Sequence, residues 1–307
     1  MASLPLAASS GDLIADRRFA IARDLAARGE LAGAAEVLMQ ALELTPKFRA
    51  AWFALGEVRE TLGDRAAAAE AFRRVLLLDP DDEQGASVRL AHLDTRTQAM
   101  PPAYVRNLFD QYAPRYEEAL VERLGYCAPR LLREAVEAAQ RARGLPIRFR
   151  RMLDLGCGTG LAAEAFVACC ENIIGFDLSR AMIEQAASKH LYAGLAIADL
   201  IDALDREHES ADLIIAADAL VYLADLDRVC RAAARVLEPR GLFAFTTETH
   251  DGAGVVLGRK LRYAHSAACV RDALAAAGLT VLSLDAGSAR KEGAVPVPGL
   301  VAVAAQD

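Results

Sequence analysis

The sequence has little of what several large classes of protein require. Its six cysteines show no C-x-x-C spacing and no accompanying histidines, so we expect reduced thiols, with neither a disulfide framework nor a metal site. Basic residues are not in excess, because the formal net charge is −7, and this disfavours nucleic acid or an anionic membrane surface as the main partner. No uncharged run is long enough to span a bilayer, and no basic segment introduces a signal peptide. These absences predict a cytoplasmic protein.

What the sequence does contain is typical of an ordered globular protein. Hydrophobic residues make up 54% of the 307 residues and charged residues 25%. A chain of this length usually forms about two domains. Aromatic residues account for only 6%, so a segment in which they gather is informative.

The first part of the chain repeats itself at a period of about 34 residues, which resembles two tetratricopeptide repeats. Small residues at matched positions let paired helices approach, and large residues fill the space between them. Two repeats bury little apolar surface, so residues 83–94 are predicted to form a capping helix, and an ordinary pair of helical hairpins is the alternative. We expect an all-α domain over residues 1–94. The matched positions are Gly29 and Gly63, Ala34 and Ala68, Leu38 and Phe72, Ala41 and Val75, and Pro46 and Pro80.

The strongest functional signal is the segment 152–160, with the sequence Met-Leu-Asp-Leu-Gly-Cys-Gly-Thr-Gly. An apolar run meets an acid, three alternating glycines follow, and an Ala-rich segment comes next. This order predicts a buried strand, a tight turn and a helix. Glycines permit unusual backbone angles and let a ligand approach the main chain without meeting a Cβ. We therefore expect this turn, and the carboxylate of Asp154 before it, to contact a ligand.

A second acid follows about 20 residues later, where a ribose-binding carboxylate is expected. Asp177 ends the apolar segment 172–177, and Ser179 then suits the N-cap of a helix. Gly158-x-Gly160-x-x-Ala163 with this acid also fits the fingerprint of a dinucleotide site. A nicotinamide site does not require an acid ahead of the glycines or the methionine at 182, so these two residues favour another cofactor.

The chain resembles the class I S-adenosylmethionine-dependent methyltransferases in two motifs, Asp154-x-Gly-x-Gly-x-Gly and Asp177–Leu178–Ser179-x-x-Met182. The match continues in order through Asp199, residues 211–218 and residues 239–241. It implies an α/β, Rossmann-like domain over residues 95–307, with a mostly parallel sheet, a closing antiparallel pair at the C-terminus, and S-adenosylmethionine as the cofactor. A nucleotide site or an inactive Rossmann-like scaffold is the alternative. The strands are expected near residues 152–155, 172–177, 195–198, 211–217, 242–247, 280–284 and 299–305.

The resemblance also implies roles for individual residues. Asp199 or its neighbour Leu200 would receive the adenine amino group, and Leu178 and Met182 would flank the adenine ring. Asp218 follows the fourth strand, at the edge where ligands bind in open α/β sheets. The expected cofactor contacts are Tyr104, Tyr112, Asp154, Gly156, Cys157, Gly158, Gly160, Asp177, Leu178, Met182, Asp199, Leu200 and Asp218.

An aromatic segment lies just ahead of the predicted domain core. Residues 95–102 suit a linker, and residues 104–116 contain the pattern F-D-x-Y-A-x-x-Y. This resembles the lid of methyltransferases that act on small metabolites and on quinone or carrier-bound intermediates. By that resemblance Tyr104, Tyr112 and Tyr116 would close over the methionine end of the cofactor, with linker and lid together spanning residues 95–125. An amphipathic helix that packs its aromatic residues inward is the alternative.

The sequence says less about the methyl acceptor. Methyl transfer from a sulfonium is a direct displacement, so the protein mainly aligns the reacting groups, and a base is needed only when the nucleophile must lose a proton. Candidates follow the fourth and fifth strands, although a lone histidine is more often a structural group. Residues 218–221 are Asp-Ala-Leu-Val, not the Asn/Asp-Pro-Pro-Tyr/Phe set of base and glutamine methyltransferases, so that chemistry is disfavoured. The candidate catalytic residues are Tyr222, Glu248, His250 and His265.

We therefore expect a cytoplasmic methyltransferase with an N-terminal repeat domain. It is similar to the predicted repeat-containing methyltransferases and, more distantly, to those of ubiquinone and biotin synthesis. The leading hypothesis is methylation of an oxygen or carbon on a small molecule, free or carrier-bound. One alternative is modification of a protein recruited by the repeats, and another is a non-catalytic adaptor that binds the cofactor. The repeats are further expected to contact a protein partner or a second subunit, with no nucleic-acid or membrane partner.

Overall fold

The computed structural model describes residues 9–94, 99–118, 124–258, 260–293 and 295–306. The chain divides into two compact units, Met1–Tyr104 and Val105–Asp307. The predicted boundary after residue 94 falls earlier than this division. One reason is a contact of Tyr104, whose ring lies so close to Gly85 that a Cβ there would be 2.8 Å from it. No helix in the described ranges is long and apolar enough to cross a membrane.

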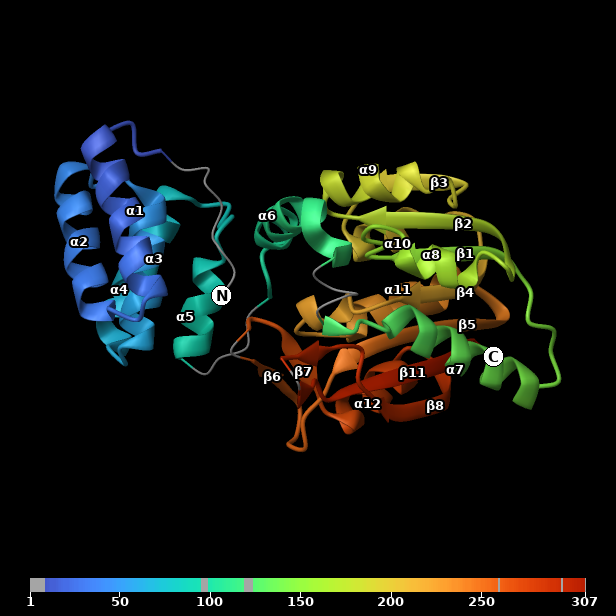
Figure 1. The fold of residues 1–307 in the computed structure, drawn as a ribbon. Coiled ribbons are helices and arrows are strands. Elements are labelled where there is room, and N and C mark those ends of the chain that lie inside the picture. Colours follow the sequence, from blue (N-terminus) through green and yellow to red (C-terminus); the bar gives the residue numbers. More distant parts are fainter. Residues whose placement is uncertain (1–8, 95–98, 119–123, 259, 294, 307) are drawn as a thin grey trace. The chain divides into compact units, whose positions relative to one another are not determined.

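The first unit is built from helices, as the repeat pattern predicts (Figure 1). Each helix packs against the next along the chain. The predicted capping helix is confirmed as α5. Gly29 and Gly63 end the first helix of each pair with nearly equal φ angles, +82° and +83°, so the period in the sequence is also a period in the backbone. The helices are α1 (Leu13–Ala27), α2 (Leu31–Leu44), α3 (Arg49–Thr61), α4 (Arg65–Leu78) and α5 (Ala86–Leu93).

The second unit contains a mostly parallel sheet with the strand order β3-β2-β1-β4-β5-β11-β8. β11 runs antiparallel to both β5 and β8, while the pairs from β3 to β5 are parallel. The predicted fold class, including the closing antiparallel pair, is confirmed. The strands are β1 (Phe149–Leu155), β2 (Cys170–Asp177), β3 (Gly194–Ile197), β4 (Ala211–Ala216), β5 (Leu237–Glu248), β8 (Leu279–Gly287) and β11 (Gly299–Gln306).

Two short hairpins were not expected from the sequence. β6 (Val255–Leu257) pairs with β7 (Tyr263–His265), and β7 adds to the end of β5 by a parallel pair between Glu248 and Ala264. β9 (Lys291–Glu292) pairs with β10 (Val295–Pro296) in the connection from β8 to β11. Both hairpins are too short for an alternating pattern to reveal them.

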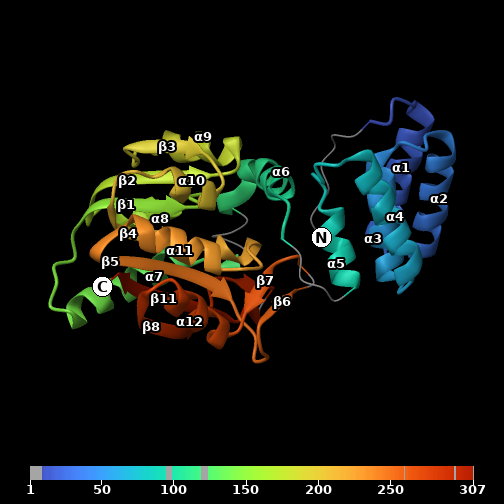
Figure 2. The same ribbon diagram turned by 180° about the vertical axis from the view of Figure 1, so that it is seen from behind.

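Helices cover both faces of the sheet, so each strand buries side chains on both sides. In β4, Leu213 and Ile215 join the core under α7 and α8, while Ile214 and Ala216 join the core under α10, α11 and α12. Figures 1 and 2 show these two layers from opposite sides. The helices are α7 (Ala128–Ala142), α8 (Leu161–Phe166), α9 (Arg180–Ser188), α10 (Leu200–Arg206), α11 (Asp227–Val236) and α12 (Ala267–Ala276).

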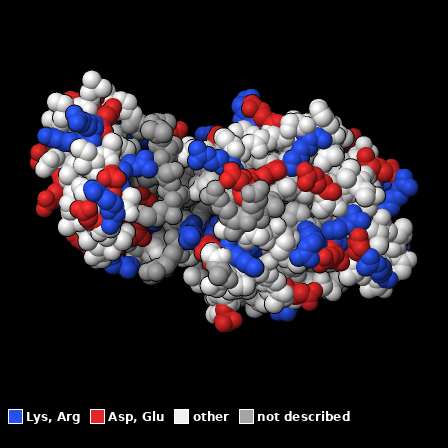
Figure 3. All heavy atoms as spheres, in the orientation of Figure 1, with Lys and Arg blue, Asp and Glu red and all other residues white. Residues whose placement is uncertain are grey.

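The parallel order brings the carboxyl ends of β1, β2, β4 and β5 to one edge of the sheet. The acids that end or follow these strands therefore gather there, namely Asp154, Asp177, Asp218 and Glu248. On the face seen in Figure 3, basic and acidic side chains are interspersed on both units.

The close approach of α3 and α4 gives a test of the helical unit. A Cβ at Gly56 would lie 2.5 Å from the ring of Phe72, whereas at Gly33 in α2 the nearest atom would be 3.8 Å away. We expect Gly56→Ala to lower the free energy of unfolding of this unit by about 1–3 kcal/mol because the core is overpacked. Gly33→Ala should be neutral or stabilise by up to about 1 kcal/mol. Urea unfolding followed by circular dichroism measures both. Equal effects would contradict this packing.

Candidate active site

The glycine turn after β1 adopts the left-handed backbone that its sequence predicts. Gly156, Gly158 and Gly160 have φ angles of +67°, +53° and +90°. A Cβ at Gly156 would lie 2.6 Å from the Cβ of Ala219, so this glycine is needed for packing. A Cβ at Gly158 would meet only a ring carbon of Tyr116, at 3.9 Å. The second glycine therefore presents an open main chain.

A pocket adjoins the glycine turn. Burial raises the pKa of both Tyr116 and Tyr126, and the nearby charge of Asp218 raises each further, so both side chains remain neutral phenols. The hydroxyl of Tyr126 lies 3.4 Å from the main-chain oxygen of Ala217. The pocket is lined by Tyr116, Tyr126, Gly156, Cys157, Gly158, Thr159, Leu161, Ala162 and Ala217.

Asp154, near the end of β1 just before the glycine turn, is completely buried. Its Oδ2 accepts a hydrogen bond of 2.7 Å from the hydroxyl of Tyr192, and its Oδ1 has no partner among the residues described. Burial raises the pKa of this carboxyl to about 7. Tyr192 lies between α9 and β3 and belongs to no motif that would have predicted the hydrogen bond to Asp154. Its ring also fills the space beside Gly160 and Gly175.

Asp177 connects the glycine turn to the start of α9. Its Oδ2 accepts a hydrogen bond of 2.9 Å from the N–H of Gly158, and its Oδ1 accepts one of 2.8 Å from the N–H of Ser179. Burial raises the pKa of the carboxyl, while these hydrogen bonds oppose the rise. Each carboxylate oxygen can accept a second hydrogen bond, so contact with a ribose stays a prediction.

The residues predicted to surround an adenine differ in their accessibility. Leu178 is partly exposed. Asp199 caps α10 by accepting from the N–H groups of Ile201 and Asp202, at 2.8 and 3.3 Å, and Leu200 begins that helix. Met182, in contrast, is completely buried. Its side chain packs in the interior, and its contact with the ring stays a prediction.

The aromatic segment forms α6 (Pro102–Tyr112) and the short helix η1 (Ala113–Arg115). Polar contacts fasten it along α9. Asp110 Oδ1 accepts from the hydroxyl of Ser179 at 2.6 Å, and Gln185 Nε2 donates to the oxygen of Ala113 at 2.5 Å. Lys189 is paired with Glu117 at 2.6 Å.

Of the three tyrosines predicted to form a lid, Tyr116 alone lines the pocket. The side chain of Tyr112 is 38% exposed, and Tyr104 lies against Gly85 in the helical unit. The α-helix ends at Tyr112 and a 3₁₀ turn follows at Ala113–Arg115, so the regular helical spacing does not continue to Tyr116. Tyr126, which lines the pocket, was missed. The predicted lid beyond Glu118 lies partly outside the described residues.

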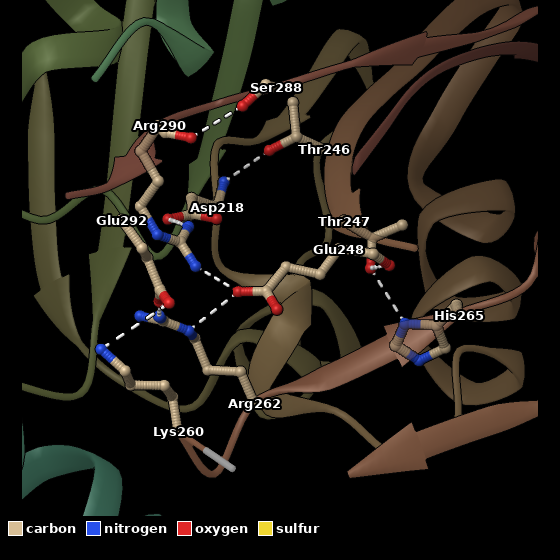
Figure 4. A network of polar contacts seen from close by, with 10 residues as sticks. All are labelled: Asp218, Thr246, Thr247, Glu248, Lys260, Arg262, His265, Ser288, Arg290 and Glu292. Atoms are coloured by element: carbon tan, nitrogen blue, oxygen red, sulfur yellow. Dashed lines mark hydrogen bonds and ion pairs between the residues drawn. The ribbon is translucent and has the colours of Figure 1, made fainter. Parts of the chain in front are cut away.

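A network of ion pairs lies at the ends of β4 and β5 (Figure 4). The guanidinium of Arg290, of which only 2% is exposed, binds both Asp218 and Glu248. Arg262 Nε lies 2.8 Å from Oε1 of Glu248, and Arg262 Nη2 lies 2.5 Å from Glu292. Lys260 completes the network at 3.7 Å from Glu292. Asp218 thus binds an arginine, and its predicted role at the cofactor stays a prediction.

The four candidate catalytic residues differ in their burial and in their partners. Glu248 is engaged by two arginines, so it is not a free base. His265 is completely buried with Nδ1 2.9 Å from Thr247 Oγ1, and burial lowers its pKa to about 4. His250 accepts from the N–H of Gly252 at 3.1 Å, within its own loop. Tyr222 packs edge-on against Phe109, with ring centroids 5.4 Å apart. None of the four lines the pocket.

Comparison with known proteins agrees with this architecture. Residues 153–245 match the family model of the methyltransferase domain, and residues 49–82 match the tetratricopeptide repeat. A ubiquinone biosynthesis O-methyltransferase of Chelativorans sp. is 32% identical over 105 residues, which are 33% of this chain and 42% of that protein. The chain therefore spans less than half of that relative.

A longer match is found with human methyltransferase-like protein 27, at 30% identity over 203 residues, or 64% of this chain and 77% of that protein. The crystal structure of the N-methyltransferase NodS from Bradyrhizobium japonicum, in complex with S-adenosyl-L-homocysteine, shares the fold with a TM-score of 0.50 and 17% identity. It covers 66% of this chain and 98% of that one. The chain belongs to the class I S-adenosylmethionine-dependent methyltransferases and carries a tetratricopeptide repeat ahead of the methyltransferase domain.

Proposed function

We propose that this protein transfers a methyl group from S-adenosylmethionine to an oxygen or carbon atom of a small molecule, free or attached to a carrier. The observation that carries this proposal is the pocket beside Gly158, which is lined by two partly buried tyrosines, Tyr116 and Tyr126. A concave pocket lined by aromatic rings suits a small acceptor better than a protein surface. The Chelativorans relative is named for an O-methyltransferase reaction, which favours oxygen.

The residues around the turn fit the cofactor. Gly158 leaves space for the cofactor against the main chain. Asp154 Oδ1 is a buried acceptor without a donor among the described residues, and the ammonium group of the methionine part would provide one. Asp177 would hold the ribose hydroxyls, and Asp199 or Leu200 the adenine amino group. When bound, the cofactor supplies a methyl group already activated on a positively charged sulfur. The protein then has to orient the acceptor and exclude water, for which the rings of Tyr116 and Tyr126 are suited.

A protein acceptor recruited by the helical repeats is the second candidate, because arrays of this type present surfaces to peptides. A non-catalytic adaptor would use the same cofactor pocket. Incubation with methyl-labelled donor and a cell extract separated by size distinguishes the three. Label in the small-molecule fraction supports the proposal, and label in the protein fraction supports the second candidate. Binding of S-adenosylhomocysteine without transfer supports an adaptor. Failure to bind it contradicts all three.

The open side of Gly158 can be tested with a matched glycine. Gly144 has a similar φ of +65°, and a Cβ there would meet nothing within 4 Å. Alanine at either position should lower the free energy of unfolding by about 1–2 kcal/mol, because both backbones are left-handed. We expect Gly158→Ala to abolish measurable binding of S-adenosylhomocysteine in calorimetry, and Gly144→Ala to retain it. Normal binding by the Gly158 variant would mean that the turn faces another ligand.

The raised pKa of Asp154 predicts a pH dependence. An ammonium group binds the ionised carboxylate, so affinity for S-adenosylhomocysteine should rise about tenfold between about pH 6 and pH 8, as Asp154 with its pKa of about 7 loses its proton. The stability that this acid contributes to the free protein has the opposite trend. It is present below the usual pKa of 3.8 and is lost as the pH rises to about 7.

Two variants distinguish the titration of Asp154 from that of other groups as the cause of the pH-dependent affinity. Asp154→Asn should weaken binding and remove this rise in affinity. Tyr192→Phe should move the rise to higher pH, because the tyrosine hydroxyl holds the pKa of Asp154 down. Calorimetric titrations at several pH values measure both. An unchanged pH profile in the asparagine variant would show that another group titrates.

A further inference from the structure

The backbone of Asp218 has an unfavourable conformation, which its neighbours must stabilise. Its φ is +58°, a left-handed conformation that non-glycine residues seldom adopt and that is common at functional sites. Its N–H donates a hydrogen bond of 2.8 Å to Thr246 Oγ1 on the neighbouring strand β5. The strand end is therefore fixed in a conformation that aims the side chain in one direction.

Arg290 fixes the carboxylate of the same residue. It comes from the connection between β8 and β9, where the main-chain oxygen of Ala289 accepts a hydrogen bond of 2.8 Å from the N–H of Cys127. The guanidinium binds Oδ2 of Asp218 through Nη1 and Glu248 through Nη2. A buried guanidinium is stable only when it is paired, so this arginine holds the carboxylate in a single position (Figure 4).

The position of Asp218 is beside the pocket. Ala217, directly before it, lines the pocket, and the Cβ of Ala219, directly after it, lies against Gly156 of the glycine turn. The negative charge of this carboxylate helps to raise the pKa of Tyr116 and of Tyr126, which line the same pocket. Arg290 binds Oδ2 of this carboxylate, and an ionised carboxylate has about four acceptor positions, so Oδ1 has the capacity to accept a hydrogen bond from a ligand.

The charges nearby decide which acceptor the pocket suits. Asp218 and Glu248 carry two negative charges, and Arg290 and Arg262 carry two positive ones, so the four balance. Both arginines already bind carboxylates, which leaves no excess positive charge for an anionic acceptor. An ionised carboxylate oxygen instead binds a group that donates a hydrogen bond.

We infer that Asp218, positioned by Arg290, accepts a hydrogen bond from a neutral hydroxyl group of the methyl acceptor and takes its proton during transfer. This inference rests on the proposed function and narrows it to oxygen. In the step, the acceptor oxygen forms a bond to the methyl carbon while the bond from that carbon to sulfur breaks and leaves its electron pair on sulfur. The hydroxyl proton passes to Oδ1 of Asp218. Charge balances, because the positive sulfur becomes a neutral thioether and the carboxylate a neutral acid.

The test compares Asp218→Asn with Glu292→Gln in the full-length protein. Asparagine tolerates the left-handed backbone, so the first variant should fold. The second makes the same change of carboxylate to amide in the outer part of the network, where Glu292 binds Arg262 rather than Arg290. Calorimetry with S-adenosylhomocysteine is the first measurement; similar affinities within a few-fold are expected for the unmodified protein and Glu292→Gln, and the affinity of Asp218→Asn sets the concentration that saturates this variant. If the unmodified protein does not bind it, the proposed function itself fails.

The second measurement uses phenol and its methyl ether, anisole, as probes. They suit a pocket walled by aromatic rings, and they differ in the one hydrogen that Asp218 would accept. Binding to protein saturated with S-adenosylhomocysteine is followed by ligand-observed NMR. We expect the unmodified protein and Glu292→Gln to prefer phenol about tenfold or more, since a hydrogen bond to a charged group is strong, and Asp218→Asn to lose most of this preference. Absence of the preference in the unmodified protein, its survival in Asp218→Asn, or an equal loss in Glu292→Gln would each overturn the inference.

Discussion

The rest of the site depends on the two hydrogen bonds that the carboxylate of Asp177 accepts. One comes from the glycine turn after β1 and the other from the first residues of α9. The hydrogen bond from Gly158 restrains a turn of three left-handed glycines, the residues with the largest conformational freedom to lose. Ser179, which donates one of these hydrogen bonds, also binds Asp110 of the aromatic segment. One acid thus connects the glycine turn after β1, the start of α9 and, through Ser179, the aromatic segment.

The acids at the carboxyl edge of the sheet have different environments, and these suggest a division of roles. Burial raises the pKa of Asp154, the hydrogen bond from Tyr192 lowers it, and one oxygen has no donor among the described residues. Asp177 is held by main-chain N–H groups. Asp218 and Glu248 are held by arginine. A parallel sheet places all four acids together, and their different partners are the basis of the roles proposed for them in binding a cation, a ribose or a protic acceptor.

Much of this architecture could be predicted from the sequence, because its signals are local. The glycine turn, the acid about 20 residues later and the apolar strands are read within short windows. The period of the helical repeats is also local, and it gave the capping helix. The residues that were missed act across long distances in the chain. Tyr192 reaches Asp154, Tyr126 reaches Ala217, and Arg290 reaches Asp218. The same reason explains why the ion pairs of Glu248 were not expected, because Arg262 and Arg290 lie in connections beside strands that are too short to leave a pattern.

The central claim, that the cofactor binds between the glycine turn and the aromatic segment, is tested most directly by amide hydrogen exchange with and without S-adenosylhomocysteine. The account predicts slower exchange in the turn at residues 156–160, at the start of α9 and across residues 105–117, because the ligand would lie between them. The helical unit at residues 13–93 should exchange at the same rate in both states. Protection confined to the helical unit, or unchanged exchange in the turn when calorimetry shows binding, would contradict the account.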